Sequence, residues 1–246
     1  MVDPRDRASV WWSAIAQRAR EHRLWWRRGR RGPGRILLEG ENVRAAKLAD
    51  LPGLRLVDCD LSRSTLLGDM TKLELERCLL DSLLVDGHLE QARLVECHGY
   101  TLSLENARLV RARLDRCVFL RSDLSRTDLT GLIARGCDFT DSDLADATLT
   151  RATFRRCNFR NATLVGRKRL GPFGASEGTR FFQCDLRGVD WQGRRLTGVT
   201  FDRCAFHGCR GVPRVGADCV ILAPDFSAEF DGSDVGTAER LLAEWA

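Results

Sequence analysis

The side chains of this sequence with the richest chemistry are its ten cysteines and four histidines. Structural zinc sites need convergent thiolates or imidazoles and usually contain a Cys-x2-Cys pair, but the closest two cysteines, Cys204 and Cys209, are five residues apart. The histidines show no ligand spacing and no partner motif: they are His22, His88, His98 and His207. The sequence therefore predicts no metal and no cofactor, and small buried thiols in a reducing compartment.

The acidic residues give no sign of catalysis. Asp123, Asp138 and Asp143 each stand directly before a regularly spaced apolar residue, where hydrogen bonding to a turn explains an aspartate better than acid–base work does. No nucleophile elbow, phosphate-binding loop or pair of catalytic acids is recognisable. We therefore expect that the protein is not an enzyme.

The elements that carry these side chains follow a five-residue period. From Leu89 to Leu164, every fifth residue is a large apolar one in 14 of 16 positions, and the residue two places earlier is Gly, Ala, Cys, Ser or Thr in 14 of 16. At two positions the sizes are exchanged, Leu132 for a small residue and Ala134 for a large one, which conserves the volume of a packed interior. Residues two apart share one side of a strand, so each unit is predicted to be a short strand followed by a corner.

A longer, twenty-residue period gives the number of sides. Cys97, Cys117, Cys137 and Cys157 follow one another at a constant spacing of four units. The sequence therefore predicts a four-sided solenoid in which equivalent side chains stack in columns and each coil advances by ~4.8 Å. It divides the chain into an Arg/Trp-rich segment (1–35), the solenoid (36–222) and a C-terminal cap with a short helix (223–246). Within the solenoid we expect an irregular stretch at 67–83 and a projecting, Gly-rich basic loop at 165–178.

Stretches such as Cys137–Asp141, Ser142–Asp146 and Ala162–Leu164 resemble the A(D/N)LXX repeat of the pentapeptide-repeat family, over roughly residues 51–211. The resemblance implies an all-β fold, a right-handed quadrilateral β-helix with short helical N- and C-terminal segments. Some members of that family, including those linked to quinolone resistance, resemble duplex DNA and bind DNA gyrase or topoisomerase IV. The resemblance thus implies a non-catalytic protein-binding rod with a type II topoisomerase as partner, and a homodimer through the C-terminal helix. A generic scaffold with an unidentified partner is the alternative.

The partner-binding residues expected on this basis lie in the loop and in an acidic belt: Arg167, Lys168, Arg169, Leu170 and Phe173, then Asp138, Asp141, Asp143 and Asp146. The belt is flanked by arginines, and an offset of one coil would stack Arg121 on Asp141 and Arg126 on Asp146. Two interpretations stay open: the acids of the belt pair with the flanking arginines, or these acids attract a basic partner.

The basic excess of the chain sits at its N-terminus. Residues 1–35 hold ten arginines and three acids, whereas residues 36–246 hold 29 Lys/Arg against 31 Asp/Glu. A nucleic-acid-binding protein is expected to carry a basic stripe on its folded body, so we expect no direct contact with nucleic acid. The segment also holds Trp11, Trp12, Trp25 and Trp26, which either cap the first coil or anchor residues 9–28 at a membrane surface in an adaptor role.

Composition places the protein among soluble chains. Hydrophobic residues make up 43% and charged residues 30%, and the longest uncharged run, Ala8–Gln17, is about half of a bilayer span. No apolar stretch with a cleavage site opens the chain, so the expected location is the cytoplasm.

Overall fold

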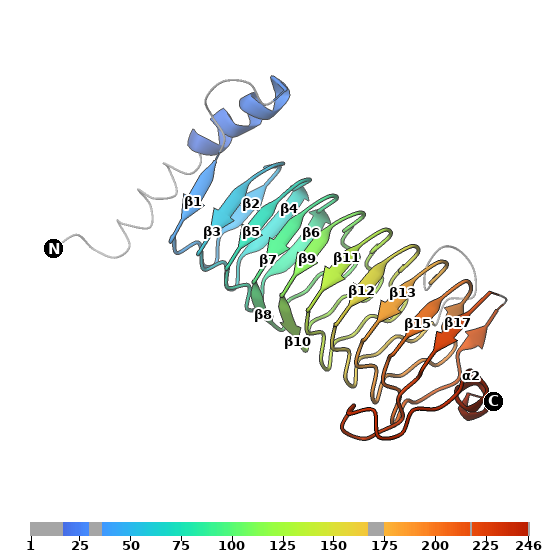
Figure 1. Ribbon diagram of the computed structural model, residues 1–246. Coiled ribbons are helices and arrows are strands. Elements are labelled where there is room, and N and C mark those ends of the chain that lie inside the picture. Colours follow the sequence, from blue (N-terminus) through green and yellow to red (C-terminus); the bar gives the residue numbers. More distant parts are fainter. Residues whose placement is uncertain (1–16, 30–35, 167–174, 217, 246) are drawn as a thin grey trace.

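The computed structural model describes residues 17–29, 36–166, 175–216 and 218–245, which form one elongated stack of coils (Figure 1). The chain is a right-handed, four-sided β-helix, which confirms the predicted fold class. Ten parallel strands follow one another along one side, and nine steps of ~4.8 Å make this side about 43 Å long. In the described part of the chain, no helix is long and apolar enough to cross a membrane.

The four sides of each coil are named A to D in chain order. Face A is the ten-stranded sheet: β1 (Leu37–Glu39), β3 (Arg55–Val57), β5 (Glu74–Glu76), β7 (Arg93–Val95), β9 (Arg113–Asp115), β11 (Ile133–Arg135), β12 (Thr153–Arg155), β13 (Arg180–Phe182), β15 (Thr200–Asp202) and β17 (Val220–Leu222). Face B holds β8 (His98–Tyr100) and β10 (Val118–Leu120). Face C begins with β2 (Lys47–Ala49), β4 (Thr65–Asp69) and β6 (Leu84–His88). Face D holds β14 (Arg195–Leu196) and β16 (Arg214–Val215). Elsewhere on faces B to D, isolated β-bridges between single residues join neighbouring coils.

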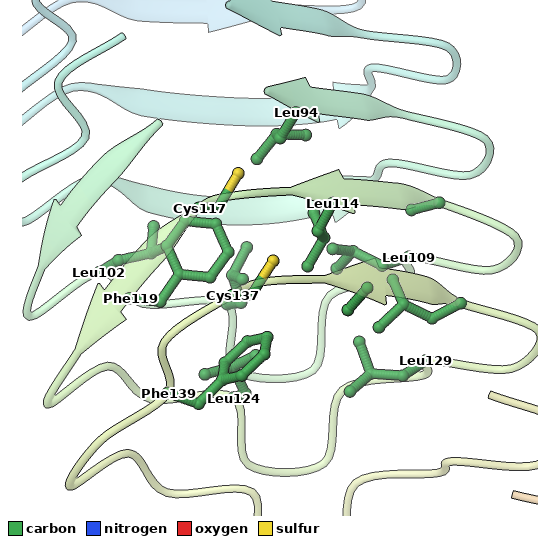
Figure 2. Packing of buried hydrophobic residues seen from close by; sticks show 14 of the residues in the cluster. Leu94, Leu102, Leu109, Leu114, Cys117, Phe119, Leu124, Leu129, Cys137 and Phe139 are labelled. Atoms are coloured by element: carbon green, nitrogen blue, oxygen red, sulfur yellow. The ribbon is translucent and has the colours of Figure 1, made fainter. Parts of the chain in front are cut away.

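The core consists of columns in which equivalent inward side chains of successive coils stack, as the longer period predicts. Figure 2 shows Cys117 and Cys137, and likewise Phe119 and Phe139, at equivalent positions of neighbouring coils. The ring centroids of Phe139 and Phe159 lie 4.9 Å apart with an interplanar angle of 13°. These side chains are buried, so the inward positions of the repeat form one continuous apolar core.

The stretch 67–83, which we expected to be irregular, continues the coils with a local change in their length. Face A pairs Leu56 with Leu75 and Leu75 with Leu94, so each of these two coils is one residue shorter than the next coil, which pairs Leu94 with Leu114. These coils are one residue shorter at the corner between faces C and D. Strands β4 and β6 run through this corner and pair over five residues. Within this stretch the period is interrupted only at that corner, which shifts the phase without breaking the coil.

The range predicted for the loop, 165–178, includes described residues at both ends that belong to the coils. The amide of Gly166 donates to the carbonyl of Gln192 at 3.0 Å, and the carbonyl of Ala175 accepts from the amide of Leu149 at 2.8 Å. Both ends of the insertion therefore belong to the coil wall. On face A, Phe154 pairs with Ala134 and with Phe181, so the coil after Phe154 is seven residues longer than the coil before it.

Helices cover the two ends of the stack. At the N-terminal end, residues 17–27 are helical and bury Ala19 and Trp25. At the C-terminal end, α2 (Ala238–Glu244) begins at Thr237, whose side chain accepts from the amide of Arg240, and buries Leu241. Trp245 follows α2 and packs edge-on against Phe206, with ring centroids 5.9 Å apart. Each end of the apolar core is thus closed by the chain itself.

Candidate interaction surfaces

The residues that could do chemistry serve the fold in the structure. The imidazole of His22 is fully buried, where Nδ1 accepts from the amide of Ile36 at 2.9 Å and Nε2 lies 2.7 Å from the carbonyl oxygen of Pro52. This histidine joins the N-terminal helix to the first coil. Within the described residues, no three side chains of the metal-binding types come together.

The cysteines form a column of thiols along the interior. Eight of the ten are buried, and Cys209 and Cys219 are partly exposed. Burial raises the pKa of the Cys157 and Cys184 thiols, so both are protonated at neutral pH. A protonated, enclosed thiol is a poor nucleophile and a poor metal ligand, which fits a packing role.

The acidic belt is not a row of unpaired carboxylates. Oδ1 of Asp138 accepts from the amide of Thr140 at 2.9 Å, and Oδ1 of Asp143 accepts from the amide of Ala145 at 2.8 Å. These are the turn hydrogen bonds expected of an aspartate before an apolar residue. Asp146 is buried. The belt acids therefore contribute to the coil as well as to the surface charge.

The flanking arginines pair with acids across coils, though not always with the expected one. Arg121 lies 3.7 Å from Asp141, as predicted, and the amide of Asn161 also donates to Asp141 at 3.2 Å. Arg126, by contrast, pairs with Glu105 of the preceding coil instead of Asp146, which corrects the second predicted pair. Exposed pairs of this kind contribute little to stability, about 0–1 kcal/mol each.

The five predicted loop residues all lie outside the described residues: Arg167, Lys168, Arg169, Leu170 and Phe173. The described residues that flank them, Gly166 and Ala175, lie at the corner between faces C and D.

Arg194 is a charged residue at an inward position of the repeat, next to Ala175 and Ser176. Its side chain is fully buried, Nε donates to Oγ of Ser176 at 2.8 Å, and one terminal nitrogen donates to the carbonyl oxygen of Ala147 at 2.7 Å. In the preceding coils, the equivalent carbonyls of Ala107 and Thr127 accept backbone amides. The guanidinium of Arg194 thus satisfies a carbonyl at the coil that the insertion interrupts.

Arg194 keeps its charge in this setting. Burial lowers its pKa to about 9, and the nearby carboxylate of Asp146 acts in the opposite direction. At neutral pH the guanidinium is therefore protonated, and two carbonyls and a hydroxyl surround it, with the Ala175 oxygen at 3.4 Å. Small side chains at positions 147, 175 and 176 leave room for it.

The tryptophans of the N-terminal helix contact the rod. Trp25 is 9% exposed, and Trp26 lies so close to Gly53 that a Cβ there would be 2.6 Å from its ring. The ammonium of Lys72 lies 5.8 Å from the Trp26 ring centroid. Trp11 and Trp12 lie outside the described residues.

The C-terminal helix uses its apolar side within the chain. Leu241 is fully buried and Trp245 is 5% exposed, because both cover the last coil next to Trp191 and Phe206. A homodimer through this same apolar side would compete with the cap, which argues against the expected helix-mediated dimer.

Comparisons with known proteins agree with the repeat pattern. A family model for pentapeptide repeats matches residues 102–131 and 137–166, in eight copies. No curated protein sequence matches the chain. Among solved structures, HetL from the cyanobacterium Nostoc sp. strain PCC 7120, involved in heterocyst differentiation regulation, is 21% identical over 81% of this chain and 89% of its own, with a TM-score of 0.33.

A second similar structure is full-length QnrB1, described as a plasmid-mediated fluoroquinolone resistance protein. It is 12% identical over 85% of this chain and 96% of its own, with a TM-score of 0.29. At these identities and TM-scores, neither likeness carries a conclusion about a partner.

Proposed function

We propose that this protein, whose chain carries pentapeptide repeats and winds into their β-helix, is a non-catalytic scaffold that binds another protein. The observation that carries the proposal is the unbroken parallel register of face A, ten strands long, with both ends of the core capped. Such a stack presents flat polar sides whose side chains hold fixed spacings, which suits recognition by an extended partner surface. A cytoplasmic location belongs to the proposal, since all ten cysteines are free thiols.

The more specific proposal is that the partner is a type II topoisomerase, DNA gyrase or topoisomerase IV. Face C supports it, because its solvent-accessible outward positions between residues 103 and 193 hold four acids and one arginine: Glu105, Asp123, Asp143, Asp190 and Arg126. Asp123, Asp143 and Asp190 lie in one column, although the sequence presents them far apart. A row of carboxylates along a rod offers a basic DNA-binding groove a partial substitute for phosphates. The predicted loop residues Arg167, Lys168, Arg169, Leu170 and Phe173 follow Gly166, which lies at the end of this face.

A supercoiling assay with purified gyrase, with and without a quinolone, tests the specific proposal. We expect the protein to inhibit supercoiling or to protect it from the drug, and the double variant Asp123→Asn/Asp143→Asn to lose most of that effect. Asparagine keeps the oxygen that caps the turn, as Asn158 does natively by accepting the amide of Arg160 at 2.9 Å. The variant therefore removes charge without removing the turn hydrogen bond.

The matched control is Asp60→Asn/Asp128→Asn, which removes two capping carboxylates from faces B and D. Equal losses in the two double variants would contradict a role for face C. No effect of the native protein at micromolar concentration would overturn the topoisomerase assignment.

The alternative, an adaptor anchored at a membrane surface by residues 9–28, has support in the exposed side chains of the N-terminal helix. Leu24 is 50% exposed and stands beside exposed arginines such as Arg20 and Arg27. Trp25 and Trp26, however, contact the rod, so only Trp11 and Trp12 remain as candidate anchors. Co-sedimentation with anionic vesicles that is unchanged in Trp11→Ser/Trp12→Ser would contradict this alternative.

A further inference from the structure

The fold sorts the charges of the repeat region onto opposite sides of the rod. Between residues 91 and 183, the outward and corner positions of face A hold nine arginines and two acids: Arg93, Arg111, Arg113, Arg116, Arg135, Arg151, Arg155, Arg156 and Arg180, with Glu96 and Asp115. We call these nine the arginine patch. Face C, the third side of each coil and thus opposite face A, carries the acids named above. The near-neutral total charge of residues 36–246 conceals this separation. The folded body therefore does carry a basic stripe, which removes the reason for expecting no contact with nucleic acid.

The arginine patch is largely unpaired. Among the residues that the structure describes, Arg116 alone of the nine forms an ion pair, with Glu96 at 2.7 Å. Arg156 donates to the side-chain oxygen of Gln183 at 3.1 Å, and the guanidinium of Arg155 lies 4.8 Å from the centroid of the Phe182 ring. All nine side chains are exposed, so their charge is available to a partner.

Glycine at one corner opens a shallow groove in the arginine patch. Gly136 stands between Arg116 and Arg156 in the column of corner residues, with a φ of +59°. Its missing side chain leaves a groove lined by Arg116, Arg135, Arg155 and Arg156, with Asp115 as the one acid. Four guanidinium groups around one opening provide donors for an oxyanion from several directions.

We propose that face A binds the phosphate backbone of nucleic acid, without regard to base sequence. β7, β9, β11, β12 and β13 repeat the arginines at ~4.8 Å along the axis, over four steps and thus about 19 Å. The cations are all arginine, whose planar fork donates two parallel hydrogen bonds to a phosphate. Nucleic acid is a linear polyanion with one charge per ~3.4 Å of each strand, a spacing of the same order as that of this row.

Two other occupants fit face A less well. A membrane surface favours cations together with exposed apolar side chains that enter the headgroup region, and among the described residues between 91 and 183 no large exposed hydrophobic one belongs to face A. A second copy of this chain would have to offer face C, whose acids are fewer than the nine arginines of the patch and would leave most of that charge uncompensated.

The test measures the fluorescence anisotropy of two labelled 20-base-pair DNA duplexes of unrelated sequence, titrated with the full-length protein at several salt concentrations. We expect equal affinity for both duplexes and a linear fall of the logarithm of the binding constant with the logarithm of salt. Arg113→Glu/Arg135→Glu should lower the affinity at least tenfold and reduce the salt slope by ~0.9 for each phosphate that the variant no longer neutralises. These two arginines lie on adjacent strands, β9 and β11.

The control variant is Arg160→Glu/Arg195→Glu, which makes the same change of charge on faces B and D at exposed arginines. It should bind nearly as the native protein does. The ten arginines of residues 1–35 are present in every variant, so a difference between the two variants belongs to face A. Circular dichroism and melting temperature verify that both variants fold.

Several results would overturn the proposal. These are no binding at micromolar protein in low salt, equal losses in the two variants, or a strong preference for one duplex. Another such result is DNA binding that the Arg113→Glu/Arg135→Glu change leaves unaffected. If the change then abolishes sedimentation with anionic vesicles, face A binds a membrane surface. If it dissociates a self-associated species, face A binds a second copy of this chain. The outcome is separable from the gyrase assay, since that assay depends on face C.

Discussion

Gly87 lies directly over Gly68 in the neighbouring coil, so closely that a Cβ on Gly87 would stand 2.2 Å from the carbonyl oxygen and 2.8 Å from the amide nitrogen of Gly68. This contact occurs where β4 and β6 run through the corner between faces C and D. The two glycines allow the shortened coils to close, because backbone meets backbone where other coils have an inward side chain.

Gly87→Ala is therefore expected to destabilise the protein by about 2 kcal/mol or more, since backbone atoms must move to admit a methyl group. Urea unfolding followed by circular dichroism measures the change. Gly99→Ala is the control: a Cβ there would contact Leu80 and Leu102 at 3.4 Å, an ordinary distance, in the inward column where Phe119 sits one coil later. A loss as large in Gly99→Ala as in Gly87→Ala would contradict this account.

Phe139→Ala should cost ~3–5 kcal/mol, because it leaves a cavity in the centre of the aromatic column. The ring is 1% exposed, stacks on Phe159 and meets Phe119 edge-on at 5.9 Å. Phe139→Leu, which keeps most of the volume, should lose clearly less. The comparison uses the same urea titration, and similar losses for both variants would show that the coil collapses around the site.

Arg194→Ala should destabilise the protein by about 3 kcal/mol or more, since it removes the donor to the Ala147 carbonyl and leaves a buried cavity. Arg194→Met fills the space without the charge, so it should recover part of that loss. The measurement is the melting temperature of the native protein and of the two variants. If both variants have the same melting temperature, below that of the native protein, the hydrogen bonds to Ala147 and Ser176 contribute more to stability than the filled volume does.

Acid should weaken the pair of Asp58 and Arg77. The Arg77 guanidinium donates to both carboxylate oxygens, at 2.7 and 2.8 Å, and holds the pKa of Asp58 below its ordinary value. The pair therefore stabilises the folded state above about pH 4 and loses that contribution as the pH falls through the lower folded-state pKa. Asp58→Asn should be less stable than the native protein at pH 6, with the difference shrinking toward pH 2.5. A constant difference across that range would assign the effect to something other than this titration.

Thiol chemistry should distinguish the interior cysteines from the two near the C-terminal end. With a chromogenic disulfide reagent, the native protein should expose at most Cys209 and Cys219, and the remaining eight thiols only after unfolding in guanidinium. Rapid modification of more than two thiols in the folded protein would show that the cysteine column opens in solution.

The five-residue period was sufficient to predict which side chains point inward. Inward positions such as Leu114, Cys117 and Phe119 are buried, because alternation along a strand is local and a closely packed interior tolerates few side chains other than apolar ones. The same pattern identified the four sides. It could not place the stretch 67–83, since the shortened corner at Gly68 and Gly87 depends on contact between coils and leaves no periodic signal.

The distribution of charge was decided by the tertiary structure. Arginines that are neighbours on face A, such as Arg113 and Arg135, are separated along the chain by more than a whole coil, whereas the nearby acids Asp123 and Asp138 lie on other sides. An acidic belt counted along the sequence, from Asp138 to Asp146, therefore mixes faces B and C, whereas the structure separates a basic side from an acidic one. The sequence determined what each coil buries, because that follows from neighbours along a strand. Which exposed charges act together depends on how each coil is offset from the next, and on insertions such as the one that Arg194 supports.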